Sequence, residues 1–280
     1  MRAHAKGRPG FTLIEMMIAI TILAFFGTAL TKILVVQTRL FSKAAAQRGT
    51  RSVTRSAMNM IDSDLRMVEA THGIVAAGSQ TLTVRVPYAL GVVCGTTGGI
   101  TYLSVAPVDS TVWATAGTTG YAWKDTLNAW NFTETGLTIA STSSAVCTAA
   151  SITTLTNGKT VSVSPGLPAG AVQGTIMLFE EQVKYEFKNS SAVPGAYGLW
   201  RTIVSTGASN EIVTPFTSTA AFRYYVGNAD TSQASPPSPL SNARGIEFTL
   251  NARSVNAPEG SGSYQTSSLT TAVFFRNRTN

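Results

Sequence analysis

Glu15 lies near the start of an apolar segment, where an ionised side chain is costly. The run Gly10-Phe11-Thr12-Leu13-Ile14-Glu15 opens a stretch that ends at Val36, and within residues 11–36 only Glu15 and Lys32 are charged. An ionised residue in a membrane segment normally has a partner and a function. The chemistry indicated is therefore ion pairing in lipid. The alternative is an ordinary anchor whose Glu15 lies at the headgroup boundary without consequence.

Residues that could support catalysis or bind a metal are scarce. The chain has two histidines, His4 and His72, no Cys-x-x-Cys and no glycine-rich phosphate loop. Two pairs of carboxylates are too generic to indicate a metal site: Asp62 with Asp64 and Glu180 with Glu181. We therefore expect no catalytic residue, no metal and no cofactor, and we expect that the protein is not an enzyme.

The residues around Glu15 describe a membrane segment with a basic flank. Residues 1–10 carry Arg2, Lys6 and Arg8 and no acidic residue, as expected on the cytoplasmic side. As one helix, residues 11–36 would extend about 39 Å, more than the ~30 Å hydrocarbon layer. Gly10 precedes the apolar stretch, whereas a secretory signal has its small residues after it. This reversal favours a cut on the cytoplasmic side that leaves the helix attached.

The sequence G-F-T-L-I-E followed by an apolar helix resembles the class III signal of type IV pilins and type II secretion pseudopilins. The resemblance implies that a prepilin peptidase cuts after Gly10 and that Phe11 becomes an N-methylated amino terminus. A neighbouring subunit's terminal ammonium would then supply the countercharge that Glu15 needs in lipid. The implied role of Glu15 is to set the register of subunits during assembly.

A helical pattern continues beyond the membrane segment, over residues 37–72. Residues 37–71 contain no proline and one glycine, Gly49, near which we expect a bend. The helix is predicted to end near Glu69. Apolar residues at three- and four-residue spacings form a stripe that should pack on a head: Val53, Ala57, Met60, Ile61, Leu65 and Val68.

From Ile74 the composition changes to Thr, Ser, Val, Gly and aromatic residues in short alternating runs, which is typical of an antiparallel β domain. The expected strands are 81–86, 175–180, 182–188, 199–204, 220–226, 245–252 and 269–276, with Leu82, Val84 and Val86 on one face. The proline-rich residues 231–239 are predicted to be a loop. The predicted fold class is α+β, pilin-like, with leader 1–10, helix 11–72 and a β-rich head over 73–280.

Four further segments resemble the W-type minor pilins (PilW), and the first of them also resembles the J-type pseudopilins. Met60-Ile61-Asp62-Ser63-Asp64-Leu65-Arg66 is similar to their I-D-x-D-L-R stretch. In the head, the similar segments are Val183-Lys184-Tyr185-Glu186-Phe187, Gly198-Leu199-Trp200-Arg201 and residues 271–278. Many major pilins have a proline where Lys32 stands here and a disulfide-bounded loop near the carboxyl terminus. The absence of both favours a minor component.

The middle region, about 89–165, is expected to be an insert in the head. It contains both cysteines, Cys94 and Cys147, for which an oxidising compartment favours a disulfide and two buried thiols are the alternative. Its aromatic residues are expected to fill the core of an inserted β subdomain, with a binding face for a partner as the alternative: Trp113, Tyr121, Trp123, Trp130 and Phe132.

Composition fits an exported protein with one anchor: 280 residues, 44% hydrophobic and 12% charged. The formal charge of +7 falls by three, to +4, when the leader is removed. Five cations follow the membrane segment and could contact anionic lipid or neighbouring subunits, with nucleic acid as an alternative: Arg39, Lys43, Arg48, Arg51 and Arg55.

Together these features predict a minor pilin-like subunit of a priming or tip complex of a type IV pilus. The alternatives are a pseudopilin of a type II secretion system and a tip module for adhesion or DNA uptake. The expected partners are a prepilin peptidase, other pilins or pseudopilins through the N-terminal helix, an inner-membrane assembly platform, and membrane lipid before assembly. DNA or a surface ligand has no supporting motif. The expected location is the cytoplasmic membrane, crossed once with the head outside the cytoplasm, and afterwards the pilus or pseudopilus.

Overall fold

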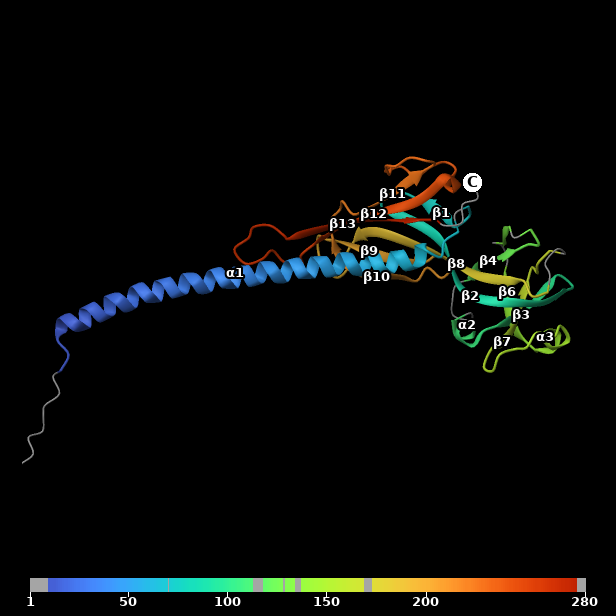
Figure 1. The fold of residues 1–280 in the computed structure, drawn as a ribbon, viewed down its shortest axis with the longest axis horizontal. Helices are drawn as coiled ribbons and strands as arrows, with labels where there is room; N and C mark the ends of the chain where they lie inside the picture. The colour runs from blue at the N-terminus through green and yellow to red at the C-terminus, as the bar shows by residue number, and fades with distance from the viewer. Residues whose placement is uncertain are drawn as a thin grey trace, which may run out of the picture. The chain divides into compact units, whose positions relative to one another are not determined.

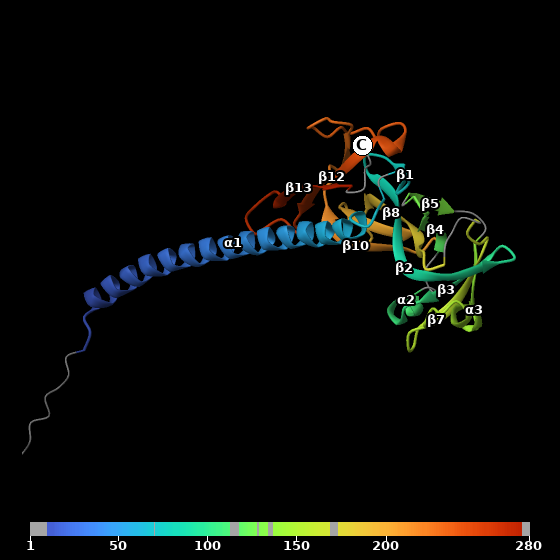
Figure 2. The ribbon, with the colours of Figure 1, turned by 45° about the vertical axis from the view of Figure 1, so that its right-hand side comes forward.

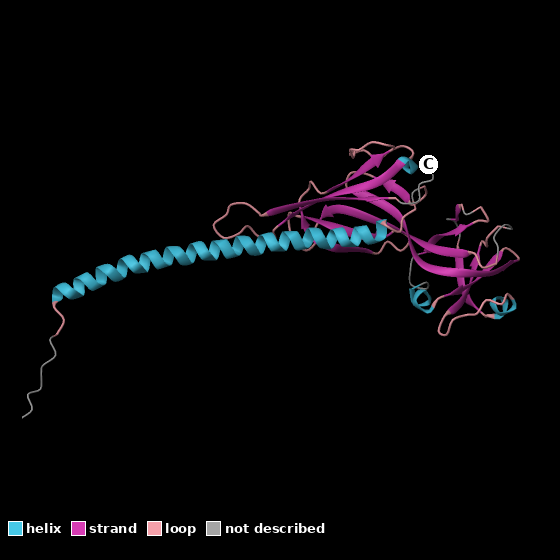
Figure 3. Cartoon of the chain, in the orientation of Figure 1, coloured by secondary structure: helices cyan, strands magenta, loops and turns pink. Residues whose placement is uncertain are grey.

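The computed structural model describes residues 10–69, 71–112, 118–127, 129–133, 137–168 and 173–275. The chain divides into two compact units, which are described separately. The first comprises Met1–Gly49 and Ser254–Gln265, and the second comprises Thr50–Arg253 and Thr266–Asn280. Figure 1 labels the elements along the chain, and Figure 3 separates the helices from the strands.

Helix α1, Leu13–Leu65, contains 53 residues and passes through Gly49 without interruption. It ends four residues before the predicted Glu69. The last turn tightens, because Met67 N donates to the carbonyl of Asp64 at 3.1 Å and Val68 N donates to that of Leu65 at 3.2 Å. Among the described residues, α1 is the one helix whose length and composition would allow it to cross a membrane.

The carboxyl-terminal part of α1 packs on the sheet of the second unit through the predicted stripe. Ala57, Ile61 and Leu65 are fully buried, and Val68, just beyond the helix, is nearly so. The prediction was wrong for Met60, which is 41% exposed. Neighbouring helical residues lie about 100° apart, so Met60 points away when Ile61 faces the core.

The described strands of the head form one antiparallel sheet. Their main path runs β11-β12-β10-β9-β8-β2-β3-β7-β6, and β1, β13, β4 and β5 pair off this path. The bounds are β1 Ile74–Ala77, β2 Thr81–Thr97, β3 Ile100–Val105, β4 Thr118–Lys124, β5 Trp130–Thr133, β6 Thr138–Thr142, β7 Lys159–Ser164, β8 Ile176–Asn189, β9 Tyr197–Ile203, β10 Ser209–Phe216, β11 Ala221–Val226, β12 Ala243–Arg253 and β13 Thr266–Phe274. The short helices are α2 Pro107–Val112, α3 Ala145–Ala149 and the 3-10 turn η1 Leu240–Asn242.

Strands β2 and β8 lie side by side over most of their length and connect two hydrophobic cores (Figure 2). The first core lies under α1 and includes Leu82, Val84 and Val86 of β2, which confirms the face predicted for them. The second core includes Val93, Tyr121 and residues of β3, β7 and β8. The predicted strands 175–180 and 182–188 are one strand, since no glycine or proline interrupts β8 at Glu181. Strand β10 was not predicted, and residues 231–239 contain no strand, as expected.

An ion-paired cluster fixes the end of α1 to β8 and β9. The Tyr185 hydroxyl donates to the carboxylate of Asp64, and Arg201 Nε lies 3.4 Å from Asp64 Oδ2. Arg201 Nη2 also donates to Glu181 Oε1 at 3.0 Å. Burial, and then the charge of Asp64, raises the pKa of Tyr185, so its hydroxyl remains a donor. Residues 60–66, Val183–Phe187 and Gly198–Arg201 therefore meet at this cluster.

Replacing Asp64 by alanine should destabilise the head, because the buried hydroxyl of Tyr185 would lose its acceptor. We expect the free energy of unfolding to fall by about 1–3 kcal/mol. Urea denaturation of the full chain in detergent, followed by tryptophan fluorescence, measures the change. Asp62→Ala is the matched control, because Asp62 is on the same helix and pairs with the exposed Arg66 at 2.7 Å. That exposed pair is worth roughly 0–1 kcal/mol. Equal losses in the two variants would contradict the role given to Asp64.

Candidate functional site: the amino-terminal signal and its helix

The predicted cleavage position lies in front of α1 on an accessible stretch of chain. Gly10 and Phe11 precede the helix, and Phe11 is 85% exposed. A Cβ placed on Gly10 would have no other heavy atom within 4 Å. The peptide bond between Gly10 and Phe11 is therefore open to an enzyme, and no described part of the chain covers it.

Thr12 and Glu15 form a capping box at the first turn of α1. Glu15 Oε2 accepts hydrogen bonds from Thr12 N at 2.9 Å and from Thr12 Oγ1 at 3.0 Å, and Glu15 N lies 3.3 Å from Thr12 Oγ1. These contacts satisfy free N–H groups at the start of the helix, where the helix dipole also favours an anion. Our sequence reasoning missed this arrangement, although Thr-x-x-Glu ahead of an apolar run is its signature.

The capping box holds the carboxylate of Glu15 with neutral donors only. No described residue forms an ion pair with Glu15, and both contacts from Thr12 use the same oxygen, Oε2. The second oxygen, Oε1, is thus positioned to accept a further hydrogen bond. A cation from outside the described chain could approach it without breaking the cap.

The other polar side chains of the apolar stretch bond to their own helix. Each threonine hydroxyl donates to a backbone carbonyl three or four residues earlier: Thr21 to Met17 at 2.6 Å, Thr28 to Phe25 at 2.9 Å and Thr31 to Gly27 at 2.7 Å. Just beyond the stretch, Thr38 donates to Leu34 at 2.8 Å. Such bonds are what a hydroxyl needs where no water is available. The polar groups left with capacity to bind a partner are therefore Glu15 and Lys32.

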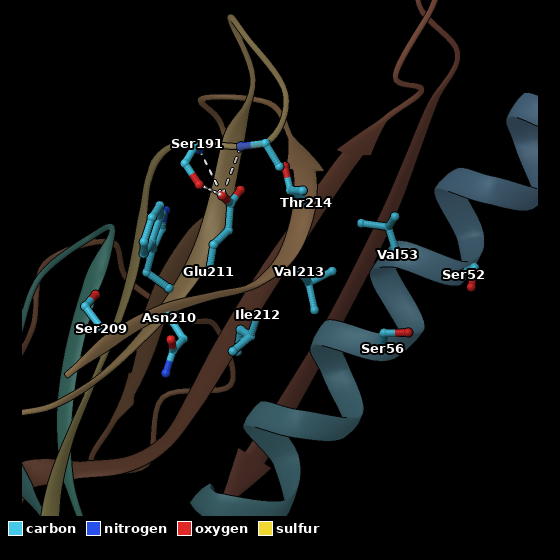
Figure 4. A pocket seen from close by; sticks show the side chains of 12 residues that line it. Ser52, Val53, Ser56, Ser191, Ser209, Asn210, Glu211, Ile212, Val213 and Thr214 are labelled. Atoms are coloured by element: carbon cyan, nitrogen blue, oxygen red, sulfur yellow. Dashed lines mark hydrogen bonds between the residues drawn. The ribbon is translucent and has the colours of Figure 1, made fainter.

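A groove of about 600 Å³ in the second unit is lined by α1 and β10 (Figure 4). Its acidic residue, Glu211, accepts hydrogen bonds through Oε2 from Ser191 N at 2.9 Å and Ser191 Oγ at 2.6 Å. Burial raises the pKa of Glu211, but the hydrogen bonds from Ser190 and Ser191 outweigh it, and the pKa lies below its usual value. Glu211 therefore stays ionised and orders the loop before β9, which is a structural role.

The histidines and carboxylates considered in the sequence analysis take structural positions in the described part of the chain. No group of three or more His, Cys, Asp or Glu side chains among the described residues could hold a metal ion. His72 lies against Phe132, with ring centroids 4.6 Å apart, and its carbonyl accepts a hydrogen bond from Arg85. Asp62, Asp64 and Glu181 are engaged in the ion pairs described above.

Cys94 of β2 and Cys147 of α3 form a disulfide in the middle region, and both residues are buried. The bond tethers α3 to the sheet across 53 residues of chain. Tyr121 and Trp123 belong to the second hydrophobic core, so they are not free to form a binding face. Trp130 and Phe132 are half-buried, and Trp113 lies outside the described residues.

Replacing both cysteines by serine should loosen the second core more than the first. A disulfide that closes a loop of this length contributes about 2–4 kcal/mol, chiefly by restricting the unfolded chain. We expect faster proteolysis between residues 94 and 147, measured by mass spectrometry of the fragments, while cleavage near α1 is unchanged. Reduction of the natural chain should reproduce the effect, and the serine variant supplies the control because reductant cannot change it further. Proteolysis of the natural chain that is insensitive to reductant would contradict this role.

Residues 6–31 match the family model described as the prokaryotic N-terminal methylation motif. The matched segment contains Gly10, Phe11, the Thr12–Glu15 capping box and most of the apolar part of α1. No curated protein and no solved structure matches the chain. The motif and the long apolar helix support a type IV pilin-like or pseudopilin role, with membrane anchoring and a pilus-type location. They indicate a structural subunit that a prepilin peptidase processes and that assembles with other pilins.

Proposed function

We propose that the protein is a minor pilin-like subunit that acts in the priming or tip complex of a type IV pilus. The observation that carries the proposal is the methylation motif at the start of α1. The helix is exposed in the isolated chain up to Phe41, and so are Gly10 and Phe11 in front of it. An exposed apolar helix needs either lipid or other helices around it. A pilin-type subunit uses both in turn, first the membrane and then the filament.

Cleavage after Gly10 would create a positively charged amino terminus, which could serve as the countercharge for Glu15. The new amino terminus, Phe11, directly precedes the capping residue Thr12, so an ammonium group would stand beside the first turn of α1. In an assembly, the terminal ammonium of a neighbouring subunit would donate to Glu15 Oε1, while Oε2 keeps its hydrogen bonds to Thr12. In a low-dielectric environment an unpaired charge is costly, so any register of the subunits that leaves the ammonium or the carboxylate without its partner is strongly disfavoured.

Two observations favour a minor subunit over a main filament subunit. The head carries a second core beyond the one under α1, and so bulky a head is difficult to repeat along a tightly packed filament. In addition, the segments that resemble W-type minor pilins converge on the Asp64 cluster. A pseudopilin of a secretion system would use the same signal and helix. A ligand-binding tip module is less favoured, because Tyr121 and Trp123 are buried in the second core.

The mature amino terminus tests the processing step. In cells with an active prepilin peptidase, we expect the chain to begin at Phe11 and to carry a methyl group on its amino nitrogen. In cells without the peptidase, the chain should begin at Met1. Mass spectrometry of the purified protein from both strains makes the comparison. A chain that begins at Met1 in both strains, or one cut beyond Val36, would refute the proposal.

Variants of Glu15 test the assembly step and separate charge from capping. Glu15→Gln keeps a side chain that can accept the hydrogen bonds from Thr12 but removes the negative charge, whereas Glu15→Ala removes both. If ion pairing sets the register, both variants should be processed normally, and both should be incorporated at least about tenfold less than the natural chain, which corresponds to ~1.4 kcal/mol. The measurement is the amount of subunit in sheared pili, relative to the amount in the membrane. Normal incorporation of Glu15→Gln would show that capping, and not charge, is what matters.

A further inference from the structure

The loop between β12 and β13, residues 254–265, lies against α1 within the first unit. Pro258 is buried, and Glu259 N donates to Ser42 Oγ at 3.2 Å. Gly260 lies so close to Arg39 that a Cβ at this position would be 2.6 Å from Arg39 Nε. The loop therefore docks beside the helical residues that follow the apolar stretch.

Hydrogen bonds within the loop fix its shape before any partner binds. Ser254 N donates to the carbonyl of Gln265 at 2.7 Å, and Gln265 N donates to Ser254 Oγ at 3.0 Å, which closes the base. Ser254 Oγ in turn donates to the carbonyl of Asn256 at 2.6 Å. Gly260 has φ +72°, a left-handed conformation that suits glycine. The loop thus presents one defined surface at the level of Val36 to Lys43 of α1.

The length of α1 places this level at a membrane surface. With Glu15 at one headgroup boundary, about 20 residues cross the ~30 Å hydrocarbon layer and reach Val35. The headgroup region adds roughly 5–8 Å on each side, which is about three to five further helical residues. Residues 36–40 of α1, and the loop docked against them, then lie in the headgroup layer.

Exposed aromatic side chains and basic side chains occur together on this part of α1 and on the loop. Phe41 on the helix is 71% exposed, and Tyr264 in the loop is 45% exposed. Arg39 and Lys43 supply positive charge beside them, next to the single acidic residue of the loop, Glu259. Aromatic rings with one polar end, together with basic residues, are enriched where hydrocarbon meets headgroups.

We propose that the β12–β13 loop is a second membrane contact of the unassembled subunit and rests in the phospholipid headgroup layer through Tyr264. The proposal rests on the single-pass anchor of the proposed function. The partner is the lipid surface itself, because the loop's level along α1 coincides with the headgroups and its exposed residues have interfacial chemistry. The docked loop would limit the depth to which α1 inserts into the bilayer.

A depth measurement on the full chain in phosphatidylcholine and phosphatidylglycerol vesicles tests the proposal. A fluorescent probe is attached to a cysteine introduced at Ile33, Tyr264 or Ala45, three positions of the same unit. Ile33 should lie in hydrocarbon, and Ala45 should lie about 14 Å beyond Val36 at 1.5 Å per residue, in water. At Tyr264 we expect strong quenching by headgroup-labelled lipid and several-fold weaker quenching by aqueous iodide than at Ala45.

The possible outcomes separate this proposal from the proposed function. A Tyr264 probe as accessible to iodide as the Ala45 probe overturns the loop contact, while an Ile33 probe that acyl-chain quenchers cannot reach overturns the anchor itself. Protection of Tyr264 that appears only at high protein-to-lipid ratio also overturns the proposal, because the cover is then a second copy of the chain.

Two glycines of the loop provide a matched pair of variants. Gly260→Val should distort the loop and expose the Tyr264 probe to iodide, because a valine is strained at φ +72° and its Cβ would also collide with Arg39. Gly262→Val should leave the probe protected, because a Cβ at Gly262 meets no other heavy atom within 4 Å. Equal protection in both variants would show that docking on α1 does not place the loop at the membrane, which contradicts the proposal.

Discussion

Helix α1 has two parts that need different environments, lipid or other helices for the first part and the sheet of the head for the second. The rest of the structure depends on this constraint. The amino-terminal part of α1 exposes apolar side chains on all sides, whereas its carboxyl-terminal part buries one stripe under the head. Burying a side chain such as Leu or Phe is worth about 1.5–3 kcal/mol, so the exposed part cannot remain in water. The first turn of α1 carries the capping box in the apolar part, and the last turn carries the ion-paired cluster that holds the helix on the head.

The two ends of the helix solve this problem in opposite ways. At the start, Thr12 and Glu15 satisfy each other and leave one carboxylate oxygen for an external partner. At the end, Asp64, Tyr185, Arg201 and Glu181 satisfy one another inside the chain. The arrangement at the start can accept an external partner, because it is exposed and Glu15 Oε1 receives no hydrogen bond from Thr12. The arrangement at the end is suited to stay closed, because breaking it would leave buried polar groups unpaired.

Local sequence patterns predicted the buried faces of the helix and of β2 well. Features that depend on contacts between residues far apart in the sequence were predicted less well. The spacing of Ala57, Ile61 and Leu65 and the alternation of Leu82, Val84 and Val86 are local signals, and both faces were correct. The class III signal is local as well, and residues 6–31 match the N-terminal methylation motif. In contrast, residues 175–180 and 182–188 were predicted as two strands, whereas β8 runs unbroken through Glu181, whose carboxylate pairs with Arg201 of β9. The capping box is an exception, because Thr12 and Glu15 are only three residues apart and the Thr-x-x-Glu signature is present in the sequence.

The pairing of β2 with β8 also bears on how such a head can diversify. Val86 pairs with Glu181 and Pro87 pairs with Glu180, so the chain leaves the first core and returns to it at adjacent positions. Everything between these points, including the second core and its disulfide, is in effect carried by one antiparallel pair. A segment attached in this way can be lengthened, shortened or exchanged without disturbing the register of the strands under α1. Natural variation could thus alter the surface of the segment between Pro87 and Glu180, while α1 and the Asp64 cluster that holds it on the head stay constant.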